Sequence, residues 1–500
     1  MSIIGSNILA GASGQAGGAA GYQIERSLRF DAPASAHLSR TPASSSNRKT
    51  WTWAGWVKRC ALGSLQFLFT GTPSGSGGNS SIAFLSGDTL YFRYLDSGAS
   101  FTTTAVYRDP SAWYHIVAVA DTDNATADDR LILYVNGVRQ TGTISAPTLG
   151  QSDGYINFNN VHFLGTQSTT YSNFYLADVF LIDSQALDPS SFGEFDTNGV
   201  WQPIDASGLT FGTNGFHLPF SDNSTAAALG TDTSGNGNTW TVNNLSVTAG
   251  AGNDSFVDSP TNYGTDTGAG GTVRGNYCTW NPLINGDTAA NGNLDVTNDT
   301  ARGTQKLLEY DAYWEITSTG GTTTAGIVSD GGTTNTTTVA NGKTYGFKLS
   351  AAGSLEYINI TDGGSFTSIT TGLTGIQFPY ASAASATTGS LNAGQRPFAA
   401  TAPSGFKALT TANLPEGTIT TSGTFTGNAN ANGPFVWLNG VPTAMTINGN
   451  AVTFATHADK LSNGFKVRTS SVSYNTSGSN TYSITTTGAK FKNARAQSNP

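Results

Sequence analysis

The sequence predicts an all-β protein made of antiparallel β-sandwiches in tandem, preceded by an extended N-terminal arm. Charged residues make up only 11% of the 500 residues, against a typical value of about 25%. Glycine is abundant, with 61 residues, and aromatic residues reach 11%. Several segments also alternate apolar and polar residues around Asn-Gly turns. Neutral polar residues, aromatics and such turns favour strands and hairpins over helices.

Charge, cysteine usage and hydropathy exclude several classes of protein. The formal net charge is −8, and no Lys/Arg-rich face suits nucleic acid, so we expect no nucleic-acid partner. The count of two cysteines, Cys60 and Cys278, excludes a disulfide scaffold. They fall in different predicted modules without a CxxC spacing, which argues against a zinc site. This usage is typical of assembly in a reducing cytoplasm. No run of 18 apolar residues occurs, so we expect no membrane insertion.

The chain divides into five predicted segments. They are an arm (1–23), a first sandwich (24–195), a Gly/Asn/Ser/Thr-rich connector (196–275), a second sandwich (276–416) and a small third sandwich (417–500). The arm is either a disordered tail or a peptide that orders on docking to a partner. Its apolar residues are the candidates for docking: Ile3, Ile4, Ile8 and Leu9. The third sandwich, with about seven short strands, is predicted to be immunoglobulin-like.

The first sandwich contains "WTWAGWVKR", "AWYHIVAVAD", "LILYVNGVRQ" and "FYLADVFLID" as predicted strands. The Asn136-Gly137 pair within the third of these is a strong hairpin signal. This order of motifs resembles the laminin-G-like, concanavalin-A-like sandwich family over residues 24 to 195. The resemblance implies a jelly roll of two antiparallel sheets.

The second sandwich contains "YWEI", "AGIV", "YGFKL", "LNAGQRPF" and "SGFKAL", in that order. These motifs resemble the SPRY family, which is another two-sheet sandwich. The sequence departs from that family in "LNAGQ", where an aromatic residue usually precedes the Gly-Gln pair. The resemblance therefore implies the fold but not the family's peptide-binding face.

A longer series runs through "FHLPFSDNS", "LGTDTSGNGNTWTVNNLSV", "YCTWNPL" and "GQRPFA". It resembles virion proteins of tailed bacteriophages, especially those of marine and cyanobacterial hosts, in which both modules occur in tandem. The resemblance implies a non-enzymatic tail fibre or receptor-binding protein that recognises a host surface polysaccharide. It also implies attachment to other virion proteins, tail or adaptor, through the arm, and a homo-oligomer, expected to be a trimer. The alternatives are a purely structural head fibre or capsid decoration protein and a polysaccharide depolymerase.

Catalytic carboxylates are the test of the depolymerase alternative. Glycoside hydrolysis requires two carboxylates about 5 to 10 Å apart. The two glutamates of the first sandwich, Glu25 and Glu194, lie at its ends. In "LEYDAYWEI" the spacing places Glu309 and Asp311 on one side of an extended strand, with Glu315 four residues beyond Asp311. We favour a solvated edge or strand entry over a catalytic pair for these residues. No nucleophile elbow or P-loop occurs, so no catalytic residue and no organic cofactor are predicted.

Two kinds of binding site are nevertheless predicted. The first is a glycan-binding site, because sugar rings stack on aromatic side chains. The aromatic candidates in polar segments are Tyr155, Phe158, Tyr171, Phe174, Trp437 and Tyr474. We expect half or more of them to be core residues. The loop "DTDNATADD" is either a solvated hairpin tip or a calcium site formed by Asp121, Asp123, Asp128 and Asp129. His115, beside Trp113 on a strand, is expected to be a satisfied core or rim residue.

Overall fold

The structure, a computed structural model, describes residues 21–73, 78–95, 98–196, 199–283, 290–414, 418–426, 434–438, 444–451, 454–461, 464–469, 479–487 and 494–498. This part of the chain is almost entirely β, which confirms the predicted fold class. Its helical segments are short 3-10 turns: η1 (Ala127–Asp129), η2 (Pro189–Ser191), η3 (Ala227–Gly230) and η4 (Thr411–Asn413). Within these residues no helix is long and apolar enough to span a lipid bilayer.

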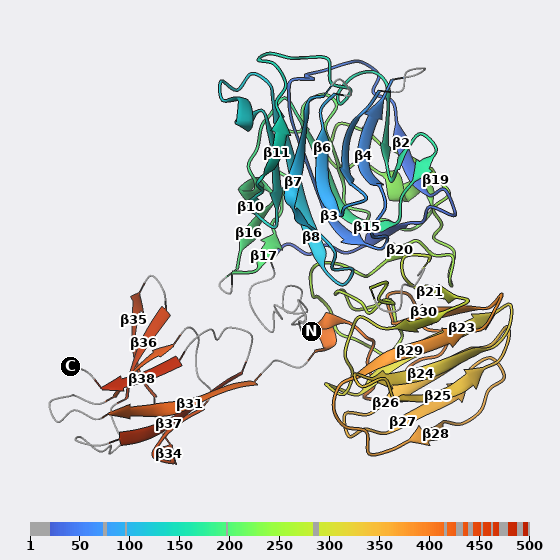
Figure 1. The fold of residues 1–500 in the computed structure, drawn as a ribbon, viewed down its shortest axis with the longest axis vertical. Coiled ribbons are helices and arrows are strands. Elements are labelled where there is room, and N and C mark those ends of the chain that lie inside the picture. Colours follow the sequence, from blue (N-terminus) through green and yellow to red (C-terminus); the bar gives the residue numbers. More distant parts are fainter. Residues whose placement is uncertain are drawn as a thin grey trace. The chain divides into compact units, whose positions relative to one another are not determined.

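The first sandwich consists of two eight-stranded antiparallel sheets (Figure 1). Sheet A contains, in spatial order, β10 (Val138–Arg139), β9 (Leu131–Val135), β8 (Trp113–Asp121), β3 (Thr50–Arg59), β15 (Phe174–Asp183), β1 (Ser27–Phe30) and β20 (Ser255–Phe256), with β18 (Phe216–Leu218) paired to β15. Sheet B contains β11 (Gly142–Ser145), β7 (Ser100–Val106), β6 (Thr89–Arg93), β5 (Ser80–Phe84), β4 (Gln66–Thr72), β12 (Val161–Leu164), β2 (His37–Arg40) and β19 (Thr241–Asn243). Two hairpins stand beside these sheets: β13 (Thr166–Gln167) with β14 (Thr170–Tyr171), and β16 (Gly193–Phe195) with β17 (Trp201–Pro203).

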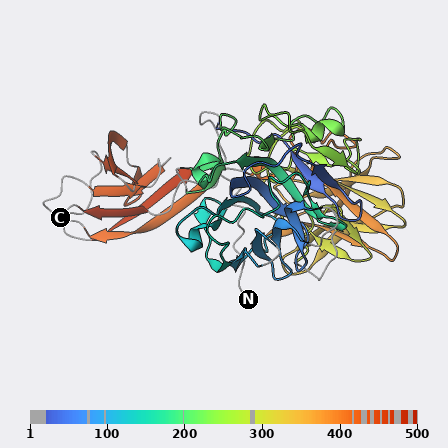
Figure 2. The same cartoon turned by 90° about the horizontal axis from the view of Figure 1, so that it is seen from above.

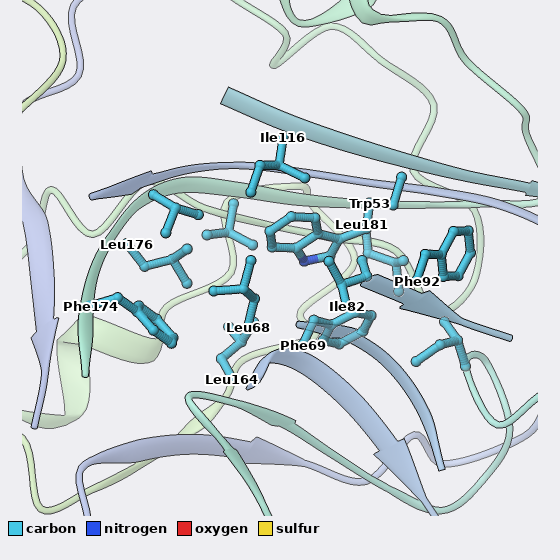
Figure 3. Packing of buried hydrophobic residues seen from close by; sticks show 14 of the residues in the cluster. Trp53, Leu68, Phe69, Ile82, Phe92, Ile116, Leu164, Phe174, Leu176 and Leu181 are labelled. Atoms are coloured by element: carbon cyan, nitrogen blue, oxygen red, sulfur yellow. The ribbon is translucent and has the colours of Figure 1, made fainter. Parts of the chain in front are cut away.

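The core of the first sandwich lies between sheets A and B. Trp53, Ile116 and Leu181 project from sheet A toward Phe69 and Phe92 of sheet B (Figure 3). The Trp53 and Phe69 rings are stacked with centroids 6.2 Å apart. Alternating apolar residues on each strand supply these side chains, because successive residues of a strand point to opposite faces.

The two sheets differ in how their outer faces are covered. In sheet A every residue of β15 and nearly every residue of β3 is buried. On its outer face Phe180 packs against Phe192 and Phe211 in a second apolar layer. In sheet B, by contrast, β6 and β12 alternate between buried and half-buried residues, although the central strands β4 and β5 are buried throughout. Part of the outer face of sheet B is therefore open to solvent.

Residues 196–275, predicted as a connector, contribute β18 and β20 to sheet A and β19 to sheet B. The first sandwich thus extends beyond the predicted range 24–195. The carboxylate of Asp232 orders this glycine-rich segment by accepting hydrogen bonds from the backbone N–H groups of His217, Ser234 and Asn238. Such local side-chain to backbone bonds hold a polar segment in place without an apolar core of its own.

The second sandwich consists of a six-stranded and a four-stranded antiparallel sheet, in yellow to orange in Figure 2. The six-stranded sheet contains β21 (Asp295–Thr297), β30 (Thr388–Asn392), β23 (Ala312–Thr319), β26 (Thr344–Leu349), β27 (Leu355–Asn359) and β28 (Thr367–Thr370). The four-stranded sheet contains β22 (Thr300–Arg302), β29 (Gln377–Ala383), β24 (Thr323–Ser329) and β25 (Thr334–Val339). Trp314 and Phe347 stack in the core between them, with ring centroids 5.6 Å apart.

One buried ion pair and several hydrogen bonds join the first sandwich to the segment that leads into the second. Lys58 on β3 donates from Nζ to Asp258 Oδ2 (2.8 Å), Asn276 Oδ1 (2.8 Å) and the carbonyl oxygen of Tyr277 (2.9 Å). Both partners of the Lys58–Asp258 pair are 1% exposed. Tyr175 on β15 also donates to the carbonyl oxygen of Gly292 (2.6 Å). The outer face of sheet A is therefore a structural interface.

The C-terminal residues form a separate compact unit. One of its four-stranded antiparallel sheets contains β31 (Thr418–Thr426), β37 (Ser479–Thr487), β33 (Ala444–Ile447) and β34 (Asn450–Ala451). The other contains β35 (Phe454–Leu461), β36 (Gly464–Thr469), β32 (Pro434–Leu438) and β38 (Ala494–Ser498).

Candidate functional site

Three aromatic rings meet on the open part of the outer face of sheet B. His37 on β2 lies 5.8 Å from Phe163 on β12 and 5.6 Å from Tyr171 on β14, measured between ring centroids. Leu38 and Leu164, the neighbours of His37 and Phe163, are buried in the core, so strand alternation directs His37 and Phe163 outward. We call these three residues the aromatic platform; all three are half-buried.

Polar groups from β2 and β19 border the aromatic platform. Asn243 donates from Nδ2 to Ser39 Oγ (3.1 Å), and Asn244 donates from Nδ2 to the carbonyl oxygen of Ser35 (3.3 Å). His37 Nδ1 lies 2.9 Å from the same carbonyl oxygen, which fixes the orientation of its ring. The platform therefore combines aromatic faces with amide and hydroxyl groups that are held in place by hydrogen bonds.

This combination suits a sugar ring. Aromatic side chains accept the apolar C–H face of a pyranose, and amide and hydroxyl groups orient its hydroxyls. Thr170, on the same strand as Tyr171, is exposed and adds a further hydroxyl.

The structure places the predicted glycan-binding residues in separate regions. Tyr171 belongs to the aromatic platform, beyond the C-terminal end of β12, whereas Tyr155 and Phe158 precede β12 and so lie at the opposite end of that strand. Arg48 lies over one face of the Phe158 ring, 4.4 Å from the centroid, and Tyr155 packs against the core. The structure thus does not bring Tyr155 and Phe158 together with Tyr171.

Phe174 was expected to be a ligand-binding aromatic, and that prediction is wrong. It is 1% exposed and packs against Phe30 with ring centroids 5.0 Å apart, because it begins β15 in register with Phe30 on β1. Trp437 lies on β32, but its side chain is outside the described part of the structure. Tyr474 and the docking residues Ile3, Ile4, Ile8 and Leu9 lie outside the described residues altogether.

Two of the four carboxylates in the acidic loop proposed for calcium pair with cations. Asp123 pairs with Lys49 (3.2 Å), and Asp129 pairs with Arg139 (2.5 Å). Asp128 is exposed within η1, and Asp121 ends β8. Among the described residues no three His, Cys, Asp or Glu side chains are grouped as a metal site requires. Calcium binding at this loop stays a prediction, and it would compete with the ion pairs of Asp123 and Asp129.

The carboxylates of "LEYDAYWEI" also have separate structural partners. Glu309 pairs with Lys306 in a bend, so Glu309 and Asp311 do not share one side of an extended strand as predicted; β23 begins only at Ala312. Asp311 accepts a hydrogen bond from the backbone N–H of Ala351 (2.8 Å). Glu315 is 2% exposed, and its carboxylate accepts from the backbone N–H groups of residues 399 and 400 (2.9 and 3.1 Å). Burial raises the pKa of Glu315, while these hydrogen bonds oppose the shift.

Two buried histidines are structural. His115 is 1% exposed and accepts a hydrogen bond at Nδ1 from Trp201 Nε1 (3.0 Å), which confirms its prediction as a satisfied core residue. Burial lowers the pKa of His115 to about 3. His162, on the inner face of sheet B, stacks on Phe69, and burial lowers its pKa to about 4. Both imidazoles are therefore neutral at pH 7.

Sequence reasoning missed His37 and Phe163 as site residues. They come from "HLSR" and "VHFL", two short segments about 125 residues apart in the sequence, which pair only in the folded sheet. The available signal was period-two alternation: a leucine adjacent to each aromatic occupies the core, which leaves the aromatic on the outer face.

Comparison with known proteins supports this fold for the first sandwich. Residues 34–191 match the family described as the concanavalin A-like lectin/glucanases superfamily. The first sandwich is therefore similar to the lectins and glucanases of this superfamily, and it has a concanavalin A-like fold. No curated protein sequence gives a significant match to the chain.

Three solved structures are among those to which the chain is similar. The heptameric SAP-like pentraxin from Limulus polyphemus is 15% identical, with 38% of this chain and 90% of that chain covered and a TM-score of 0.27. Domains LG4-5 of the mouse laminin alpha1 chain are 11% identical, with coverage of 78% and 94% and a TM-score of 0.26. The PSpry domain of TRIM65 is 12% identical, with coverage of 23% and 92% and a TM-score of 0.21.

Proposed function

We propose that this protein binds a surface glycan through the aromatic platform of His37, Phe163 and Tyr171. The observation that carries the proposal is the convergence of three rings from β2, β12 and β14 on the open part of sheet B. Ordered amides at Asn243 and Asn244 border the rings and supply hydrogen-bonding groups. The lectin-like fold of the first sandwich supports this assignment.

We further propose that the protein acts as a non-enzymatic virion protein of a tailed phage, as a tail fibre or receptor-binding protein. The sequence series that ends in "GQRPFA" supports this placement. The arm of residues 1–23 attaches the chain to other virion proteins, and a trimer presents three platforms on one fibre. Weak binding at each platform then becomes strong binding through a high effective concentration.

Glycan binding is tested with the purified full chain on an array of bacterial surface polysaccharides. We expect the Phe163→Ala and Tyr171→Ala variants to bind about 2- to 12-fold more weakly from the lost ring contact alone, since one ring contact contributes about 0.5–1.5 kcal/mol beyond its buried area. Tyr263→Ala is the matched control, because Tyr263 is a 50% exposed aromatic outside the platform. Equal losses in all three variants, or no loss in the first two, would reject the site.

The absence of hydrolysis is tested on the same polysaccharides. Glu309 and Asp311 are engaged by Lys306 and by the backbone of Ala351, so we expect no new reducing ends. Release of reducing ends that disappears in a Glu309→Gln, Asp311→Asn double variant would replace the binding proposal with a depolymerase. A virion assembled without the full chain that still adsorbs to its host would favour the purely structural alternative.

A further inference from the structure

A hydrogen-bonded series of side chains leads from the interior of sheet A to an exposed threonine. Asp178 Oδ1 lies 2.7 Å from His217 Nε2, and His217 Nδ1 lies 2.9 Å from Thr233 Oγ1. Asp178 and His217 are 2% and 5% exposed, whereas Thr233 is exposed. A carboxylate, an imidazole and a hydroxyl in this order form the arrangement that activates a nucleophile.

The tautomer of the neutral imidazole follows from its partners. The Asp178 carboxylate only accepts hydrogen bonds, so His217 Nε2 carries a proton, and the neutral imidazole then presents a lone pair at Nδ1. Thr233 then donates its hydroxyl proton to Nδ1; the carbonyl oxygen of His217, 3.3 Å from Oγ1, is a second and longer acceptor. The threonine oxygen is thus placed for proton removal by a general base.

The fold holds Asp178 and His217 rigidly. Asp178 lies in the bulge of β15 with a left-handed backbone (φ 51°), a strained conformation outside glycine and one that often marks functional positions. Tyr22 donates to the same Asp178 Oδ1 (3.1 Å) and helps to orient the carboxylate. The His217 ring stacks on Phe180 with centroids 4.1 Å apart and an interplanar angle of 8°.

We propose that Thr233 is a nucleophilic site that accepts an acyl group from an activated ester or thioester. In this step Thr233 Oγ forms a bond to the acyl carbon while the bond from that carbon to the leaving oxygen or sulfur breaks. The hydroxyl proton passes to His217 Nδ1 and then to the leaving group or to solvent. Asp178 acts as a positioning residue that holds the required tautomer.

The surrounding backbone limits this chemistry to activated donors. The N–H groups of Ser234 and Asn236, next to Thr233, are bonded to Asp232 Oδ1 and Ser234 Oγ, so neither stabilises an oxyanion. Oxyanion stabilisation is commonly the largest catalytic contribution in acyl transfer. We therefore expect a single acylation per chain with an activated ester and no turnover of unactivated esters.

The experiment treats the full chain with p-nitrophenyl acetate and follows nitrophenolate release and peptide mass. We expect one acetyl group per chain, located on Thr233. Thr233→Val abolishes the label, and Thr233→Ser restores it at an equal or higher rate. Thr225→Val, which changes another exposed threonine of the same segment, leaves labelling unchanged.

The Asp178→Asn variant tests whether the hydrogen bonds from Asp178 through His217, rather than the exposure of Thr233 alone, make Thr233 reactive. Asparagine tolerates the left-handed backbone at this position. The variant should slow labelling of Thr233 by at least about 100-fold, the lower range for general-base catalysis. Nitrogen chemical shifts of the His217 ring should show the tautomer change. Label spread over lysines, or an unchanged rate in Asp178→Asn, would overturn the proposal and leave the glycan-binding site unaffected.

Discussion

Sheet A and sheet B of the first sandwich share one core but have opposite outer faces. The outer face of sheet A is covered by Phe192, Phe211 and the ion pair of Lys58 with Asp258. The outer face of sheet B leaves Phe163 and its neighbours half-buried. Sheet A joins this sandwich to the rest of the compact unit, whereas part of the outer face of sheet B stays open to solvent.

The largest expected effect tests the covered face of sheet A. Lys58→Met leaves Asp258 as a buried, unpaired charge, which should lower the free energy of unfolding by about 3–5 kcal/mol. Lys49→Met is the control, because the Lys49–Asp123 pair is largely exposed and should contribute less than about 1 kcal/mol. Urea denaturation measures both, and equal losses in the two variants would contradict the assignment of sheet A as the interface.

A phenylalanine-to-alanine substitution on each outer face compares how much the two faces contribute to the free energy of unfolding. Phe180→Ala on sheet A removes a ring that is 2% exposed and should lower the free energy of unfolding by about 3–5 kcal/mol. Phe163→Ala on sheet B removes a half-buried ring and should lower it by about 1 kcal/mol. If thermal and urea denaturation show similar losses for both, the outer face of sheet B is as structural as that of sheet A.

Acid should destabilise the sandwich through His115, on the outer face of sheet A, and His162, on the inner face of sheet B. Burial lowers the pKa of each from 6.5, to about 3 and about 4 respectively. Below pH 6.5 the unfolded chain binds protons that the folded chain does not, so stability falls as the pH falls. At pH 5 the loss is about 2 kcal/mol for each histidine.

Single His115→Gln and His162→Gln variants test this account through the pH dependence of urea denaturation. Each variant should lose about half of the destabilisation seen in the unmodified chain between pH 6.5 and pH 5. If the full pH dependence of stability persists in the His115→Gln variant, burial does not lower the pKa of His115, and the outer face of sheet A admits water.

The smallest expected effect concerns the acidic loop at the end of β8. Lys49 and Arg139 already pair with Asp123 and Asp129, so added calcium should leave the melting temperature of the chain unchanged. Calorimetry with calcium and with a chelator measures this. A higher melting temperature in calcium would restore the loop as a metal site, since a ligand of the folded state raises stability.

Much of the fold could be predicted from sequence because the signals are local. The alternation around Trp113 and His115 correctly predicted the strand β8, which pairs with β9 in sheet A. The Asn136-Gly137 pair correctly predicted the turn between β9 and β10. The strands of residues 196–275 were harder to recognise as parts of the first sandwich. They are only two or three residues long and depend on pairing with distant strands such as β15.

The candidate site was less predictable because it is assembled by tertiary contacts. Tyr171 was predicted, but its partners His37 and Phe163 come from remote strands. Phe174 is only three residues from Tyr171, yet it faces the core, because pairing of β15 with β1 fixes its direction. Composition alone cannot distinguish these two aromatics; only strand register does.

Hydrogen–deuterium exchange of the full chain, with and without a saturating oligosaccharide selected on the glycan array, locates the bound glycan. We expect added protection in three separate segments, residues 37–40, 161–171 and 241–244, which border the aromatic platform. The strands β3 and β8 of sheet A should show no change. Protection confined to residues 155–160, to the second sandwich or to residues 418–498 would contradict the assignment of glycan binding to the outer face of sheet B.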